Sequence, residues 1–252
     1  MKKLCIHLKD GLANQLFKIA SGYGIAKRSK RQLIFDKKYI GKTHCVEHDD
    51  IIRKIILENF SMESVPSNTG YLSLGPFSYV NDLGQYQEDG LVLNGGLANE
   101  ANFIEYKDEI LDIFSCLCPG EIIAERIGFH YRLGDFLHWK NGSWIVTGQY
   151  IHDSVRKMLD HGVPPKIDVF TENPGIALKN MEAALKISPR IEQVEINFPQ
   201  KNDLETFLEM TKYHHFIASR STFSWWSFFL HQKMEPGQMV CFPDHTPFYK
   251  GV

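Results

Sequence analysis

The sequence lacks the long apolar run that a membrane-spanning helix requires. Its most apolar stretch, residues 223–230, is far shorter than the roughly 18–20 residues of a span and contains two serines. The first residues form an apolar segment that is too short for a signal peptide. We therefore expect a protein of the cytoplasm.

An excess of charge of either sign is also missing. The chain has 28 Lys and Arg residues against 30 Asp and Glu residues, a formal net charge of −2. This balance provides no general attraction to nucleic acid or anionic lipid, so any anion-binding site must be local. Cysteine is scarce, and five cysteines scattered over 252 residues indicate reduced thiols rather than a disulfide framework.

Several familiar functional motifs are absent. The chain has no P-loop, no Gly-x-Ser-x-Gly elbow and no Cys-x-x-Cys pair. His44, Cys45 and His48 carry metal-ligating atoms but lack a complete ligand set, so we expect no metal. The basic cluster Lys27–Arg31 is typical of the solvated end of a helix, which disfavours the alternative of a nucleic-acid binder.

The sequence has enough apolar residues for a large core, and strand-like and helix-like segments alternate regularly along it. The chain is 43% hydrophobic, and short β-branched runs alternate with helical patterns of about 10–15 residues. This alternation predicts parallel sheets built from strand–helix–strand units, and the series restarts after Cys118-Pro119-Gly120. We predict an α/β protein with two doubly wound, Rossmann-type domains, residues 1–119 and 120–252, facing each other across a cleft. A single continuous sheet would fit the same pattern. Strands are expected over 4–8, 33–35, 91–93, 127–132, 166–171, 191–194, 215–218 and 239–242, helices over 15–29, 51–59, 103–114, 150–161, 175–187, 203–212 and 223–232, and turns over 61–79.

Three strand-to-helix junctions carry unusual residues, and ligands of open α/β sheets bind at such junctions. The first, residues 10–17, reads Asp-Gly-Leu-Ala-Asn-Gln-Leu-Phe. Gly11 permits close approach of a ligand to the backbone, and Asn14 and Gln15 open a helix whose free N–H groups favour an anion. The alternative is an ordinary turn with Asn14 as the N-cap.

The second junction, residues 129–136, reads Phe-His-Tyr-Arg-Leu-Gly-Asp-Phe. On a strand His130 and Arg132 project to the same side, and a guanidinium offers a planar set of donors that suits phosphate. Asp135 follows Gly134, where it can orient Arg132. The alternative is a surface ion pair at the end of a strand.

The third junction, residues 218–226, reads Ala-Ser-Arg-Ser-Thr-Phe-Ser-Trp-Trp. Hydroxyl groups and the first N–H groups of a helix together can hold a diphosphate without a metal. The alternative is that Ser221 and Thr222 only cap the helix, while the tryptophans pack it against the sheet.

In order and spacing, these motifs resemble those of the α-1,2-fucosyltransferases, the bacterial and animal group that shares a His-x-Arg-Arg-x-Asp motif. Gly11–Phe17 is similar to Gly-Leu-Gly-Asn-Gln-Met-Phe, His130–Asp135 to His-x-Arg-Arg-Gly-Asp, and Ser221–Trp226 to Ser-Thr-Phe-Ser-Trp-Trp. Leu133 departs from the pattern, because the motif has its second arginine there. Residues 170–173, Phe-Thr-Glu-Asn, stand where the family has a Phe-Ser-Asp-Asp type of segment, and residues 93–97 differ from the family on the acceptor side.

The resemblance implies a GT-B-like fold and an inverting, metal-independent transfer of L-fucose. The donor would be GDP-fucose, and the acceptor a glycan hydroxyl, galactose O2 in α-1,2 linkage. Residues 1–119 would serve the acceptor and residues 120–252 the donor nucleotide. No cofactor, nucleic acid or integral membrane segment is implied, although an acceptor on a lipid carrier would favour loose membrane association.

The resemblance also implies roles for individual residues. Arg132 would contact the β-phosphate of the donor, His130 the nucleoside or diphosphate, and Asp135 would orient Arg132; these three are the candidate catalytic residues. The general base stays open among Asp10, Asp135, His138 and no protein base. Two alternatives keep the scaffold: a transferase of another nucleotide sugar, and a silent nucleotide-sugar-binding homologue. The expected donor-binding residues are Asn14, Gln15, His130, Arg132, Glu172, Asn173, Ser221, Thr222, Phe223 and Ser224.

Overall fold

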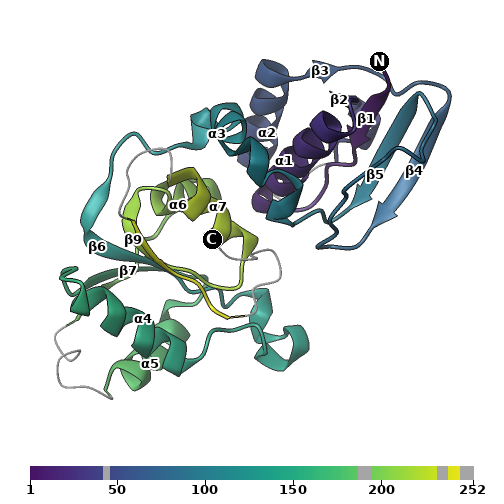
Figure 1. Ribbon diagram of the computed structural model, residues 1–252. Coiled ribbons are helices and arrows are strands. Elements are labelled where there is room, and N and C mark those ends of the chain that lie inside the picture. Colours follow the sequence, from purple (N-terminus) through teal and green to yellow (C-terminus); the bar gives the residue numbers. More distant parts are fainter. Residues whose placement is uncertain (42–45, 187–193, 232–237, 245–252) are drawn as a thin grey trace. The chain divides into compact units, whose positions relative to one another are not determined.

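The computed structural model describes residues 1–41, 46–186, 194–231 and 238–244. The chain divides into two compact units, Met1–Cys116 and a second unit that begins at Leu117 (Figure 1). Each unit contains a five-stranded parallel sheet with helices, which confirms the predicted α/β fold class. The predicted boundary after residue 119 lies just beyond this division, and the predicted arrangement across a cleft stays a prediction.

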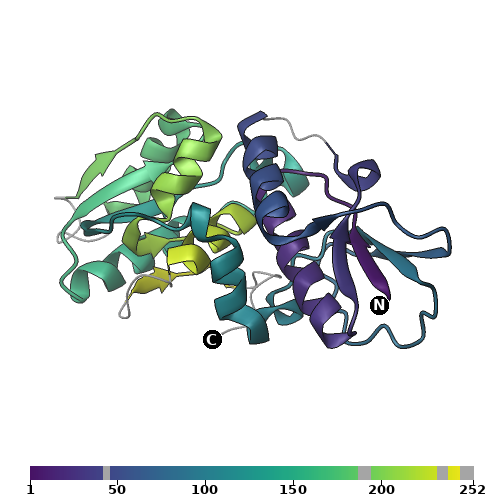
Figure 2. The ribbon, with the colours of Figure 1, turned by 90° about the horizontal axis from the view of Figure 1, so that it is seen from above.

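In the first unit, the strands are buried at the centre of the sheet and exposed at its edges. The central strand β1 (Lys3–Ile6) contains Leu4, Cys5 and Ile6, all at most 1% exposed, as expected for a parallel strand covered on both faces. Helices α1 (Leu12–Arg28) and α2 (Val46–Asn59) lie side by side (Figures 1 and 2). The strand order is β3 (Ser61–Met62), β2 (Gln32–Phe35), β1 (Lys3–Ile6), β5 (Gly90–Gly95) and β4 (Thr69–Leu74). The helices are α1 (Leu12–Arg28), α2 (Val46–Asn59) and α3 (Lys107–Ile113), with 3-10 turns at Lys37–Tyr39, Glu100–Asn102, Ile104–Tyr106 and Ser115–Leu117.

Two edge strands of this sheet fall in residues 61–79, where the sequence predicted only turns, so that prediction was wrong. β3 has two residues, and β4 alternates half-buried and exposed positions. Edge strands need little apolar sequence, and their hydrophobic signal is correspondingly weak. Helix α1 also begins earlier than predicted, at Leu12, with Gly11 at the N-cap position, so Asn14 lies inside the helix and does not cap it.

The second unit is doubly wound around the central strand β6. Helices α4 (Gly148–Asp160) and α5 (Pro174–Leu185) cover one face of its sheet, and α6 (Asp203–Met210) and α7 (Thr222–His231) cover the other (Figure 1). The strand predicted over 191–194 lies outside the described residues except for Val194, and β8 follows directly. The strand order is β10 (Met239–Cys241), β9 (Tyr213–Ile217), β6 (Ile123–His130), β7 (Lys166–Phe170) and β8 (Glu195–Asn197). The helices are α4 (Gly148–Asp160), α5 (Pro174–Leu185), α6 (Asp203–Met210) and α7 (Thr222–His231), with 3-10 turns at Asp135–Leu137 and Trp139–Gly142.

A buried carboxylate ties the strands of this sheet together. Asp168 on β7 accepts hydrogen bonds from Arg126 on β6 (2.6 and 2.8 Å), from Asn197 on β8 (2.8 Å) and from the hydroxyl of Tyr213 on β9 (2.7 Å). Burial alone would raise the pKa of Asp168, but these donors outweigh it and lower the pKa below its ordinary value. The carboxylate is therefore charged, and it fixes the relative register of four strands.

Among the helices that the structure describes, none combines the length and the apolar character needed to cross a bilayer.

Candidate functional site

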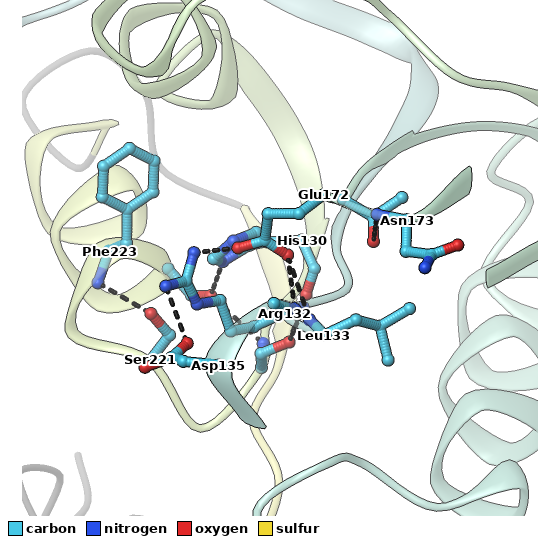
Figure 3. A network of polar contacts seen from close by, with 12 residues as sticks. His130, Arg132, Leu133, Asp135, Glu172, Asn173, Ser221 and Phe223 are labelled. Atoms are coloured by element: carbon cyan, nitrogen blue, oxygen red, sulfur yellow. Dashed lines mark hydrogen bonds and ion pairs between the residues drawn. The ribbon is translucent and has the colours of Figure 1, made fainter. Parts of the chain in front are cut away.

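The second and third motifs meet at the carboxyl end of the second sheet. β6 and β9 are neighbours in parallel register, with Phe129 opposite Ile217. Ser219 links the two segments that follow these strands, because its hydroxyl accepts from the N–H of Arg132 (2.9 Å) and donates to the carbonyl of His130 (2.5 Å). Figure 3 shows the resulting network. The structure therefore brings the two motifs together as one site.

His130 is a buried, neutral residue of this site. Its Nδ1 lies 2.6 Å from the hydroxyl oxygen of Ser224, which also accepts the N–H of Ser219 (3.2 Å). The imidazole ring packs 5.6 Å from the ring of Phe223. Burial, with a contribution from the charge of Arg132, lowers the pKa of His130 to about 3. His130 thus joins the end of β6 to helix α7, and it carries no charge near neutral pH.

Arg132 is held by two carboxylates (Figure 3). One terminal nitrogen of its guanidinium pairs with Glu172, and the other donates to Asp135 at 2.8 Å. The guanidinium also lies 5.9 Å from the ring centre of Phe136. About a third of the side chain remains exposed, so the charge is both fixed in position and accessible to a ligand.

Glu172 stabilises the turn that contains Arg132 by accepting backbone hydrogen bonds. Its second carboxylate oxygen accepts the backbone N–H groups of Leu133 (3.1 Å) and Gly134 (3.2 Å). The side chain of Leu133 is fully buried, so the position that holds a second arginine in the resembled motif adds no charge to the site. Because Glu172 uses both oxygens within its own chain, we assign it to holding Arg132 and its turn.

Asn173 and Ser221 serve as helix caps. The amide oxygen of Asn173 accepts the N–H of Ile176 (3.1 Å) at the start of α5, and in Figure 3 Asn173 lies apart from the guanidinium. The hydroxyl of Ser221 accepts the N–H of Phe223 (3.2 Å), and Thr222 is the first residue of α7. Ser221 therefore caps helix α7, as the alternative interpretation predicted. Its hydroxyl positions the loop and can in addition contact a ligand.

The first motif organises the turn after β1 in the first unit. Gln15 is buried and donates from its side chain to the carbonyl of Asp10 (3.0 Å). The fully buried ammonium of Lys18 pairs with the carboxylate of Asp10 at 2.7 Å, and Asn14 is half-buried in the first turn of α1. Asn14 and Gln15 belong to a different unit from Arg132, so their approach to a donor stays a prediction.

Sequence patterns missed three residues of the site. Ser219 and Arg220 stand inside the third motif without a predicted role. The hydroxyl of Tyr150, on α4, lies 2.8 Å from the carbonyl oxygen of Ala218 and 2.7 Å from that of Cys241, at the ends of β9 and β10. Ser219 contacts the His130 segment because β6 and β9 are neighbours in the sheet. This pairing is a tertiary contact, so no local sequence pattern could have indicated it.

No cluster of three metal-ligating side chains occurs in the part of the chain that the structure describes. His44 and Cys45 of the weak metal pattern lie outside the described residues. Arg132 and Arg220 each place a positive charge at the carboxyl end of the second sheet.

A family model for glycosyl transferase family 11 matches residues 95–235, which include the second and third motifs. The fold and this match define the protein as a glycosyltransferase. The chain belongs to glycosyl transferase family 11, the fucosyltransferase family that the motifs predicted, and it is by that membership a fucosyltransferase. No curated protein matches the chain.

Solved structures with a similar architecture include two fucosyltransferases and a heptosyltransferase. A mutant of Arabidopsis thaliana FUT1 in complex with GDP is 11% identical, with 91% of this chain and 69% of that chain covered, at a TM-score of 0.49. The α-1,6-fucosyltransferase NodZ from Bradyrhizobium, soaked with GDP-fucose, is 13% identical over 91% and 93%, at 0.40. The E. coli heptosyltransferase WaaC with ADP is 8% identical over 96% and 93%, at 0.42.

Proposed function

We propose that the protein transfers L-fucose from GDP-fucose to a hydroxyl of a glycan acceptor, galactose O2, with inversion and without a metal. The proposal rests on one observation, the guanidinium of Arg132 held at the carboxyl end of the central strand β6. Residues 120–252 bind the donor nucleotide in this proposal, and residues 1–119 serve the acceptor.

The proposed reaction requires a positive charge beside the β-phosphate of the donor, and in this proposal Arg132 supplies it. The acceptor oxygen forms a bond to the fucose anomeric carbon and gives up its proton, while the bond between that carbon and the β-phosphate oxygen breaks and its electron pair stays with GDP. Preorganised donors that face this developing charge supply the largest share of catalysis in many enzymes. A guanidinium carries five N–H donors, and its two carboxylate partners use only part of that capacity.

The start of α7 supplies further contacts to the donor. Thr222 and the backbone of Phe223 stand beside Ser221, whose hydroxyl is part of the turn. Ser224 and His130 act through that turn, because their polar atoms bond to each other.

Nucleotide binding and transfer test the proposal. Calorimetric titration in EDTA should show binding of GDP and GDP-fucose, and no comparable binding of UDP or UDP-galactose. Arg132→Ala should lose about 2–4 kcal/mol of transition-state stabilisation, roughly 30- to 1,000-fold in the rate of fucose transfer. Arg156→Ala is a matched control, because Arg156 is exposed on α4 and pairs only with Asp160 among the described residues.

Three outcomes would contradict parts of the proposal. Near-native transfer by Arg132→Ala would refute its central role. A preference for a uridine nucleotide would favour the alternative of another nucleotide sugar on this scaffold. Binding of GDP-fucose without any transfer to galactose-terminated acceptors would favour the silent homologue.

A further inference from the structure

The charge balance around Arg132 is unfavourable for a diphosphate. The single positive charge of Arg132 faces the two carboxylates of Glu172 and Asp135, which leaves a net charge of −1 in this cluster. A nucleoside diphosphate brings at least two more negative charges, and like charges at close range repel. Leu133, the nearest neighbour in sequence, is apolar and buried. A second positive charge is therefore needed at the same edge of the sheet.

Counted from a pair of residues that face each other on β6 and β9, Arg220 lies as far along its segment as Arg132 does along its own. Phe129 on β6 pairs with Ile217 on β9, and three residues further along each segment are Arg132 and Arg220. Neighbouring strands lie about 4.8 Å apart, so the two backbones leave the sheet side by side. The hydroxyl of Ser219, adjacent to Arg220, accepts the backbone N–H of Arg132 and keeps the two segments together.

The guanidinium of Arg220 makes only weak hydrogen bonds within the protein. Its guanidinium contacts two backbone carbonyl oxygens, those of Asp244 (3.4 Å) and Ser143 (3.5 Å), at the limit of hydrogen-bond distance. The side chain is half-buried at the surface. Among the arginines that the structure describes in the second unit, the other three each pair with a carboxylate; these are Arg126, Arg132 and Arg156.

We propose that Arg220 is a second diphosphate-binding residue of this enzyme, which turns from the two carbonyl groups to the phosphates of the donor. This inference rests on the proposed function and assigns one residue within it. Arg132 meets the diphosphate from the end of β6, and Arg220 meets it from the end of β9. The charge of Arg220 offsets the net negative charge that the two carboxylates leave around Arg132.

Isothermal titration of three ligands separates a phosphate contact from a structural role. Wild type, Arg220→Ala and the control Arg156→Ala are titrated with GDP, GMP and guanosine. Arg220→Ala should weaken GDP by about 10- to 100-fold, the loss of one charge-assisted pair, GMP by less, and guanosine not at all. Arg156→Ala should bind all three as wild type does. Far-UV circular dichroism and the urea midpoint establish that each variant is folded.

The outcomes distinguish this inference from the proposed function. Unchanged GDP affinity in Arg220→Ala would overturn the inference and leave the proposed donor standing. Equal losses for GDP, GMP and guanosine would also overturn it, because they would show a structural role. If wild type binds UDP instead of GDP, the donor assignment fails, and the same comparison with UDP and UMP still decides the role of Arg220. Binding of no nucleotide would overturn both.

Discussion

Asp168 offers the sharpest test of how the sheet beneath the site is held together. Asp168→Asn keeps the shape of the side chain but removes the charge that faces Arg126. The side chains of Asp168 and Arg126 are 6% and 19% exposed, so water can replace little of what is lost. Removing one partner of a buried pair typically costs 3–5 kcal/mol, and because Arg126 keeps some exposure and its contact with Glu195, we expect about 2–4 kcal/mol.

The four tryptophans provide the assay, because all of them belong to the second unit and Trp225 and Trp226 are buried there. Urea unfolding followed by tryptophan fluorescence therefore reports on the unit that contains Asp168. Glu195→Gln is the matched control: Glu195 is 57% exposed, and its loss should cost less than about 1 kcal/mol. A change below about 0.5 kcal/mol in Asp168→Asn, the range of ordinary surface substitutions, would refute this account of the sheet.

The same pair predicts a pH dependence of stability. The pKa of Asp168 is lower in the folded state than in the unfolded chain, so the folded state binds fewer protons near that pKa. The stabilisation by Asp168 is then complete above the unfolded pKa of about 3.9 and is lost as the pH falls through the folded value. The difference in unfolding free energy between wild type and Asp168→Asn should accordingly shrink below about pH 4.

Three further predictions concern other parts of the molecule. In Gly24→Ala the new methyl group would lie 2.0 Å from the carbonyl oxygen of Asn102, so we expect a loss of about 3 kcal/mol or more, seen as a lower thermal midpoint by circular dichroism. Because burial holds the pKa of His130 at about 3, its NMR resonances should not titrate at neutral pH; titration near its ordinary value of about 6.5 would contradict the buried geometry. Glu172→Gln keeps an oxygen that can accept hydrogen bonds from the turn of Arg132 but removes a negative charge that opposes the diphosphate, so GDP binding should tighten by roughly 2- to 5-fold in calorimetry; weaker binding would show that the hold of the carboxylate on Arg132 outweighs this repulsion.

The predictable part of the fold was the part with a strong periodic signal. The central strands are continuous apolar runs, and the long helices between them have clear length and spacing, so the two parallel sheets followed from the sequence. β4 escaped detection because its residues, Thr-Gly-Tyr-Leu-Ser-Leu, are half-exposed at a sheet edge. Its pairing with β5 is a tertiary contact that no local pattern encodes.

The motifs predicted that particular segments lie together, but they did not predict the hydrogen-bond partners of each residue. The sequence predicts ligand contacts for the hydroxyl, amide and imidazole groups of the motifs. In the folded chain, Ser221 and Asn173 cap helices, and His130 bonds to Ser224. Such groups satisfy backbone or side-chain partners just as well as they satisfy a ligand, so their residue type alone cannot separate the two roles. Only the assembled network distinguishes them.

This division of roles explains why the guanidinium groups carry the proposed chemistry. Short polar side chains at the carboxyl end of the sheet fix the loops: Ser219 joins the two segments, and Ser224 anchors the buried His130. A buried polar group left without a partner is costly, so these residues are committed to the protein before any ligand binds. A guanidinium has more donors than one or two partners can use, and it keeps its charge in any environment. Arg132 and Arg220 can therefore be held by the protein and still bind phosphate, which the short polar groups around them cannot do to the same extent.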